Sequence, residues 1–283
     1  MRICVAGLGI IGGSICMALK RAGYSVDGWN RSPLPPTYAL NNGIIDGIAE
    51  SFDKYDTVFV ALPPKATEEF LDKTSFKKGA TVTDICGVKK PIEAVICAKY
   101  RNFNYVGCHP MAGKEVSGIE NACADLFDNA SMVITKNAQT DEGALNVIRE
   151  LTKAMGFKYI VECSAEIHDR KIAYTSQLAH VLSNAYVKDG EIDCCVGFTG
   201  GSFQDMTRIA GVDEKMWASL YLENSENITR KITSLIASLA EIKDAIAEGD
   251  EQKLVKILAV GRELFEKSKK IEANDDIFVQ KLK

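Results

Sequence analysis

The feature that most constrains the fold is a glycine-rich hexapeptide, Gly-Leu-Gly-Ile-Ile-Gly, at residues 7–12. It follows an apolar segment, residues 2–6, that is typical of a buried strand, and it opens a segment typical of a helix, residues 12–22. In this context the first glycine permits a tight turn, the second allows a pyrophosphate to approach the backbone, and the third allows the helix to pack closely. Free N–H groups at the start of the helix favour an anion. The sequence therefore predicts a dinucleotide-binding turn.

Strand-like and helical segments alternate over the first part of the chain. The strand-like segments are residues 2–6, 24–29, 56–62, 80–84, 105–107, 131–135 and 159–161. This alternation predicts an α/β Rossmann domain, with a doubly wound and mostly parallel sheet, over residues 1–160. After residue 161 the strand-like segments stop and helix-length segments follow, so we expect an all-α domain over residues 161–283.

Two long helices in the second half carry apolar residues at spacings of three and four, and a polar break at residues 248–250 separates them. The apolar positions are Ile228, Ile232, Leu235, Leu239, Ile242 and Ile246, then Leu254, Ile257, Leu258, Gly261, Leu264 and Phe265. A heptad-like stripe of this kind packs either inside its own subunit or against a second one. The sequence alone leaves both arrangements open.

Composition excludes several classes of function. The net charge is −4, with 34 basic and 38 acidic residues scattered along the chain, which argues against a nucleic-acid-binding face. Nine cysteines lack a C-x-x-C spacing, so we expect reduced thiols in a cytoplasmic protein and no metal site. No apolar run is long enough to span a membrane, and we expect neither a membrane nor a nucleic-acid partner.

The end of the second strand bears on the choice of cofactor. NAD-preferring sites usually carry Asp or Glu there to bind the ribose hydroxyls. Here Asn30 takes that place, and Arg31 and Ser32 follow it, so a 2′-phosphate would meet a cation and no carboxylate. We therefore predict NADP in preference to NAD; the alternative is that Arg31 is simply solvated. The predicted cofactor-binding residues are Gly7, Leu8, Gly9, Ile10, Ile11, Gly12, Asn30, Arg31, Ser32, Leu62 and Pro63.

The chain holds three histidines, each in a segment with other reactive or polar residues. His109 lies in the glycine-bounded run 107–115, and His168 precedes Asp169. His168, Ser176 and His180 recur at multiples of four, which places them on one side of a helix. They form either a binding wall or a solvated face, and the clustering of imidazoles favours the wall.

Arg208 follows the glycine-rich segment 197–201, and Trp217 lies nine residues further on. A single arginine in a helix is usually a surface residue. Behind a flexible lead and between Thr207 and Ile209, a guanidinium suits a clamp for a carboxylate.

Taken together, these motifs resemble the prephenate/arogenate dehydrogenases of tyrosine biosynthesis. The matching segments are His-Pro-Met-Ala-Gly at 109–113, His168-Asp169, Ser-x-Leu-x-His at 176–180 and Asp-x-Thr-Arg-Ile-Ala at 205–210, in this order behind the fingerprint. The resemblance covers about residues 1–280. It implies a Rossmann domain, an all-α dimerisation domain, a homodimer formed by the C-terminal helices and an active site between the domains.

The resemblance also implies roles for individual residues. His109 would be the catalytic base that takes the hydroxyl proton while hydride passes to NADP or NAD, and its ordinary pKa of about 6.5 suits that task. Arg208 would anchor a substrate carboxylate. The residues expected at the substrate are Arg208, His180, Ser176, Glu115, Trp217, His168 and Asp169.

Two positions depart from the family pattern, and they bear on the substrate. Gly87 stands where many members have a serine before Val-Lys, and Ala179 stands where proline is common. We rank prephenate first and arogenate second as substrate. One rival interpretation is a β-hydroxyacid dehydrogenase or a reductase of imines or ketopantoate, for which Lys171 would be the candidate lysine. Another is a regulator that binds NADP without turnover.

Overall fold

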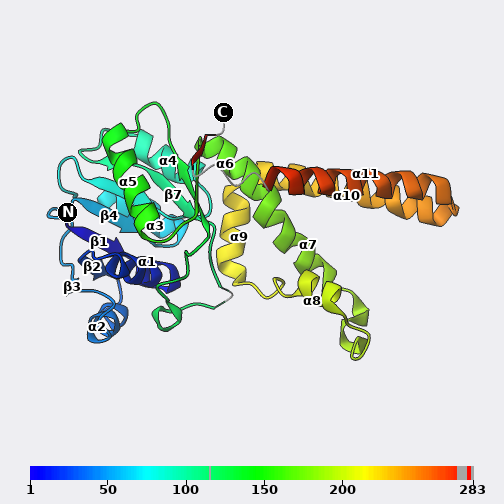
Figure 1. The fold of residues 1–283 in the computed structure, drawn as a ribbon, viewed down its shortest axis with the longest axis horizontal. Helices are drawn as coiled ribbons and strands as arrows, with labels where there is room; N and C mark the ends of the chain where they lie inside the picture. Colours follow the sequence, from blue (N-terminus) through cyan, green and yellow to red (C-terminus); the bar gives the residue numbers. More distant parts are fainter. Residues whose placement is uncertain (115, 273–278, 282–283) are drawn as a thin grey trace.

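The computed structural model describes residues 1–114, 116–272 and 279–281. Its N-terminal part is a six-stranded parallel sheet of order β3-β2-β1-β4-β5-β6 (Figure 1). The strands are β1 (Ile3–Ala6), β2 (Val26–Trp29), β3 (Gly47–Ile48), β4 (Thr57–Val60), β5 (Thr81–Asp84) and β6 (Asn104–Tyr105). The crossover helices are α1 (Ile10–Arg21), α2 (Leu34–Asn41), α3 (Pro64–Lys73) and α4 (Lys90–Cys97). This is the strand order of a Rossmann fold, so the predicted fold class is confirmed.

A second, four-stranded sheet of order β10-β9-β8-β7 adjoins the first. Its strands are β7 (Gly107–Pro110), β8 (Ser131–Thr135), β9 (Tyr159–Cys163) and β10 (Val279–Lys281). A 3₁₀ turn at Ile119–Asn121 lies between β7 and β8, and α5 (Glu142–Ala154) lies between β8 and β9. β7 runs antiparallel to β8, whereas β9 pairs in parallel with both neighbours. The sequence predicted that strands end near residue 161. β10 escaped that prediction because three residues carry no measurable periodicity.

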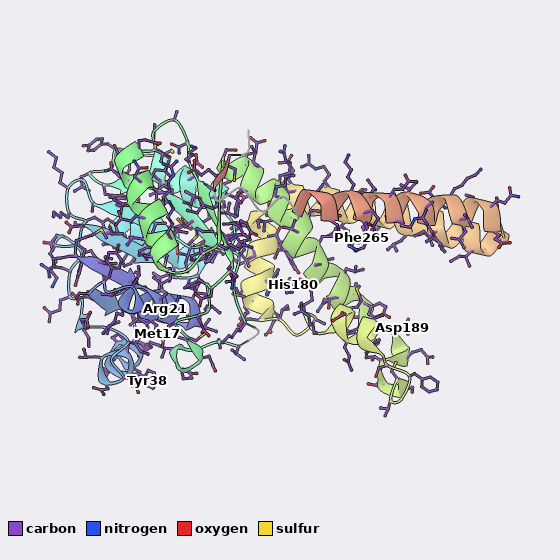
Figure 2. All side chains as sticks on the ribbon, in the orientation of Figure 1. Met17, Arg21, Tyr38, His180, Asp189 and Phe265 are labelled. Atoms are coloured by element: carbon purple, nitrogen blue, oxygen red, sulfur yellow. The ribbon has the colours of Figure 1, made fainter. Side chains whose placement is uncertain are left out.

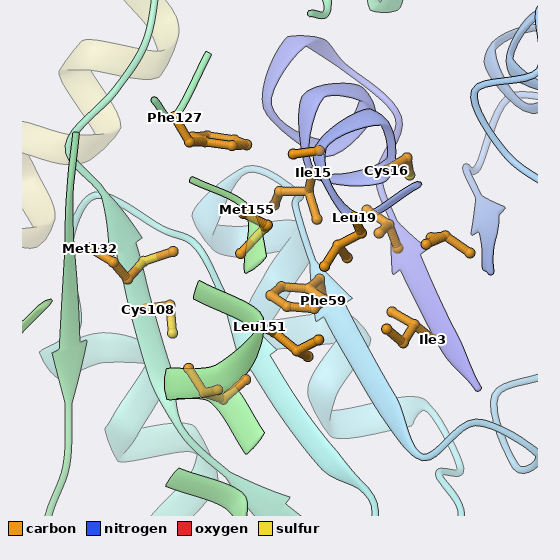
Figure 3. Close-up of a cluster of buried hydrophobic side chains, with 14 of the residues drawn as sticks. Ile3, Ile15, Cys16, Leu19, Phe59, Cys108, Phe127, Met132, Leu151 and Met155 are labelled. Atoms are coloured by element: carbon orange, nitrogen blue, oxygen red, sulfur yellow. The ribbon is translucent and has the colours of Figure 1, made fainter. Parts of the chain in front are cut away.

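The core lies between α1, α5 and the first sheet (Figure 3). Ile15 and Leu19 of α1 meet Phe59 of β4, and Leu151 of α5 and Met155 directly after that helix close the same cluster; each is at most 1% exposed. Full burial of a side chain of this size contributes roughly 1.5–3 kcal/mol. This packing fixes α1, β1 and β4 relative to one another, and therefore the loops at their carboxyl ends.

The second half of the chain is helical and reaches away from the sheets (Figure 1). It contains α6 (Ala165–Ile172), a π-helical segment (Ala173–Gln177), α7 (Leu178–Tyr186), a 3₁₀ segment (Gly190–Cys194), α8 (Gly201–Thr207), α9 (Glu214–Glu223), α10 (Ser225–Glu248) and α11 (Glu251–Glu272). α10 and α11 form a projecting hairpin, α7 and α8 form a second arm, and α9 lies beside the Rossmann part. Within the described segments no helix has the length and apolar character needed to cross a membrane.

The predicted break between the two long helices is confirmed. α10 ends at Gly249, which has a φ of 67° and therefore a left-handed conformation that glycine adopts without strain. The hairpin leaves much of its apolar stripe uncovered in the single chain: Leu239 is 50% exposed and Phe265 57%. Figure 2 shows Phe265 on this projecting hairpin, outside the Rossmann part.

Candidate active site

The glycine-rich turn has the geometry that a dinucleotide requires. Gly7 has a φ of 102°, and a Cβ there would collide with the carbonyl oxygen of Ala61. A Cβ at Gly12 would strike the carbonyl oxygen of Gly7, whereas one at Gly9 would meet nothing within 4 Å. α1 then begins at Ile10 without a capping side chain and without an acid in its first turn. Open space in front of free helix N–H groups fits a pyrophosphate.

The ribose end of this site is held to the same turn. Asn30 accepts a hydrogen bond from the Leu8 N–H (3.2 Å) through Oδ1 and donates from Nδ2 to the Ser32 carbonyl (3.4 Å). Asn30 therefore supports the loop, while Arg31 and Ser32 are exposed at the end of β2. Leu62 and Pro63 follow β4 and lie next to Ala61, at the same edge of the sheet as Gly7.

His109 lies in β7, opposite Val133 of β8, and its ring faces the loop that follows β5. A Cβ added at Gly87 would lie 3.8 Å from Nε2 of His109 and 3.6 Å from Cδ2 of Leu220. The space beside Nε2 is therefore bounded by the β5–α4 loop and by α9. Burial lowers the pKa of His109 well below its ordinary value, and the proximity of His168 and Lys89 lowers it further.

A hydrogen-bonded chain runs from the other side of His109 into the interior. Nδ1 of His109 lies 2.8 Å from Nε2 of His168, and Nδ1 of His168 lies 2.7 Å from Oδ1 of Asp169. Asp169 also accepts hydrogen bonds from the backbone N–H groups of Lys89 (2.8 Å) and Lys90 (2.9 Å), at the start of α4. His168 and Asp169 are only 2% and 1% exposed. The structure therefore places them behind His109, and the expected wall of substrate-facing residues is corrected in this respect.

A buried ion pair, which sequence reasoning missed, supports the same strand. Nζ of Lys89 lies 2.6 Å from Oδ2 of Asp84, and both side chains are 0% exposed. Lys89 also donates to the carbonyl oxygen of Cys108, and Tyr105 donates to Oδ1 of Asp84 (2.5 Å). The ion pair thus ties the end of β5 to the backbone next to His109. The sequence feature that could have indicated this pair is an aspartate at the end of a buried strand with a lysine five residues later.

His180 belongs to a second group, on the helical arm. Its Nδ1 lies 3.0 Å from the carbonyl oxygen of Ile209, and its ring centroid lies 3.8 Å from that of Trp217. His180 lies near the start of α7, and Figure 2 shows it between the Rossmann part and the end of the arm marked by Asp189. Arg208, directly before Ile209, is exposed in the single chain. Of the predicted residues, His180 and Trp217 are in contact, and His180 contacts the backbone of the residue that follows Arg208.

α9 connects the two groups. Trp217, at the His180 end, and Leu220, at the Gly87 end, are three residues apart and so are neighbours on the helix surface. Ser176 is half-buried in the π-helical segment, and Glu115 lies outside the described residues. In the part of the chain that the structure describes, no group of three His, Cys, Asp or Glu residues could hold a metal ion.

Comparison with known families agrees with this arrangement. The family description "Prephenate dehydrogenase, nucleotide-binding domain" matches residues 15–161, and "Prephenate dehydrogenase, dimerization domain" matches residues 164–260. The chain belongs to the prephenate dehydrogenase family. The resemblance inferred from the motifs is confirmed.

Individual prephenate dehydrogenases match most of the chain. The Lactococcus lactis enzyme is 30% identical over 95% of this chain and 76% of its own length, and the Bacillus subtilis enzyme is 29% identical over 92% and 74%. A crystal structure of prephenate dehydrogenase from A. aeolicus, in complex with hydroxyphenyl propionate and NAD+, has a TM-score of 0.84. It is 30% identical and covers 96% of this chain and 98% of that chain.

Proposed function

We propose that this protein is an NAD(P)-dependent dehydrogenase that oxidises and decarboxylates prephenate to 4-hydroxyphenylpyruvate, a step of tyrosine biosynthesis. The observation that carries the proposal is the placement of His109: Nε2 faces the Gly87 loop and α9, and the chain to Asp169 holds the ring from behind. The kinship with prephenate dehydrogenases supports the same conclusion.

The substrate has a hydroxyl on a cyclohexadiene ring, a carboxylate on the ring and a pyruvyl side chain. A nicotinamide cofactor bound at the glycine-rich turn supplies the hydride acceptor. His109 removes the hydroxyl proton through Nε2, because a neutral imidazole is a base suited to work near neutral pH. Loss of the ring carboxylate as CO₂ then makes the ring aromatic. Arg208 anchors a carboxylate from the helical side, with His180, Trp217 and Ser176 around the side chain of the substrate.

The test is a matrix of two substrates and two cofactors. The full-length protein is mixed with prephenate or arogenate and with NAD or NADP, and formation of the reduced cofactor is followed by absorbance. We expect prephenate to give the higher kcat/KM, and NADP to be preferred because Arg31 stands at the ribose end where an acid is usual. Higher kcat/KM with arogenate would make arogenate the substrate; higher kcat/KM with NAD would overturn the interpretation of Arg31. If neither prephenate nor arogenate led to reduction of the cofactor, the proposal would be contradicted.

The acid side of the pH profile should reflect the environment of His109. The base must be neutral to accept a proton, and it becomes protonated only when the pH falls through its pKa. Because burial lowers that pKa, activity should persist below pH 6.5, the ordinary histidine value, before it declines. The measurement is kcat/KM against pH in buffers of constant ionic strength. An acid limb centred at or above the ordinary histidine pKa would contradict this prediction.

We also propose that residues 1–160 form the cofactor domain and residues 161–283 the substrate and dimerisation domain, and that two copies associate through α10 and α11. The match to a dimerization domain over residues 164–260 supports this, as does the exposure of the hairpin stripe. Monomeric proteins rarely leave such extended apolar surface uncovered. All nine cysteines are unpaired in the structure, in keeping with the reducing cytoplasm that we propose as its location.

Placing a charge in the stripe should separate the subunits. Leu258 on α11 is 57% exposed in the single chain, and Leu258→Glu would bury a carboxylate against the partner if the hairpins meet. We expect sedimentation or light scattering at micromolar concentration to give the mass of a monomer for this variant and of a dimer for the parent. Gln252→Glu adds the same charge at an exposed polar position of α11 and should leave the dimer intact. An unchanged mass for Leu258→Glu would exclude this part of α11 from the interface.

A further inference from the structure

The hydrogen bonds around Asp169 determine which atoms of the two imidazoles carry protons. Oδ1 and Oδ2 of Asp169 receive backbone N–H donors from Lys89 and Lys90, so the carboxylate acts as an acceptor in this arrangement. It also lies at the N-terminus of α4, where the helix dipole favours a negative charge. The hydrogen on Nδ1 of His168 must then point to Asp169.

The position of the hydrogen on His168 determines the tautomer of His109. A neutral His168 with a hydrogen on Nδ1 has a lone pair on Nε2, so Nδ1 of His109 must donate across the 2.8 Å contact between them. Nε2 of His109 is then the unprotonated nitrogen, on the side of Gly87 and Leu220. Both rings are neutral at rest, because burial lowers the pKa of His109 and, against the raising effect of the Asp169 hydrogen bond, that of His168.

A positive charge on His109 alone would be poorly placed. The ammonium group of Lys89 donates to the carbonyl of Cys108, the residue before His109, and it opposes protonation of that ring. Asp169 does not contact His109; it contacts His168. A carboxylate one ring further back is useful to catalysis only if the charge, or the proton that carries it, reaches His168.

We infer that His168 and Asp169 complete a two-imidazole relay. His168 fixes the tautomer of His109, and it accepts the Nδ1 proton of His109 when Nε2 of His109 receives the proton of the substrate. The inference rests on the proposed function. In the step, the O–H bond of the substrate breaks and its proton binds to Nε2 of His109. The Nδ1–H bond of His109 breaks, and that proton binds to Nε2 of His168. The positive charge then resides on His168, 2.7 Å from the carboxylate of Asp169.

The resting half of the inference can be tested without turnover. Because the chain has three histidines, nitrogen NMR of ¹⁵N-histidine-labelled full-length protein gives three imidazoles, which the variants His168→Gln and His180→Gln assign by removing one each. At neutral pH we expect His109 and His168 both to be neutral, each with its hydrogen on Nδ1. A hydrogen on Nε2 of His109, or a charged His168, would overturn the relay. This result does not depend on which substrate the enzyme uses.

Kinetic measurements on His168 variants distinguish proton uptake by His168 from its orientation of the His109 ring. In His168→Gln an amide oxygen near the former Nε2 position can still accept from His109 but cannot take up a proton. We expect kcat to fall about tenfold or more, with KM for the substrate changed by less than about twofold. His168→Asn, whose amide is too short to reach His109, should fall at least as far. Full rescue of kcat by glutamine would reduce His168 to an orienting group and overturn the relay. A parent enzyme inactive towards prephenate and arogenate would instead contradict the proposed function.

Discussion

Replacing His109 with asparagine should lower kcat by about 10²–10⁴-fold, the usual size of a general-base contribution. Asparagine has no nitrogen that accepts a proton near neutral pH, yet it is small enough to fit in β7, where the histidine is half-buried. The glycine-rich turn at residues 7–12, where we propose that the cofactor binds, is formed by other segments, so the dissociation constant of the reduced cofactor should stay unchanged. Steady-state rates and a fluorescence titration with the reduced cofactor measure the two quantities.

The matched control for His109→Asn is Tyr100→Asn, which removes an aromatic ring from the same domain at a site that is 89% exposed. Its kcat should equal that of the parent. If His109→Asn retained parental turnover while remaining folded, another residue would have to accept the proton. His168 is too deeply buried to reach a substrate directly, so the search would then move to the helical side of the site.

The parts of the molecule that were predictable from sequence are those governed by local rules. The turn at Gly7 requires a left-handed residue and close backbone contact, so glycines at fixed spacing reveal it. Gly249 ends α10 for a similar reason. The stripe on α10 and α11 was visible as a periodicity. What packs against the stripe could not be predicted, because a heptad pattern is the same whether the partner helix belongs to the same chain or to another.

The parts that could not be predicted depend on contacts between distant segments. His168 contacts His109, which is 59 residues away in the sequence and lies in β7. Spacing along one helix suggested a common face for His168 and His180, but the two rings contact different partners. The motif resemblance predicted His168 and Asp169 as substrate-binding residues, whereas the structure buries both of them next to His109. The contact of His168 with Nδ1 of His109 becomes visible only in the structure.

The burial of Lys89 was equally invisible, and it leads to the largest expected effect on stability. Lys89→Met keeps the length of the side chain but leaves Asp84, which is 0% exposed, without its counterion. Removing one partner of a buried pair costs about 3–5 kcal/mol. We expect the free energy of unfolding in urea to fall by that amount. Hydrogen bonds from Tyr105 and from the Cys86 N–H remain on the carboxylate, but neither neutralises its charge.

An exposed lysine provides a control that distinguishes the effect of losing a buried ion pair from the effect of losing any ion pair. Lys73 pairs with Glu69 at 3.3 Å on α3, where the two side chains are 73% and 71% exposed. Water screens that pair, so Lys73→Met should leave the urea midpoint unchanged. Adding Asp84→Asn to Lys89→Met removes the stranded charge and should restore part of the lost stability. If Lys89→Met and Lys73→Met were equally mild, the Lys89–Asp84 pair would not hold the backbone beside His109. The support of β7 would then have to come from its pairing with β8 alone.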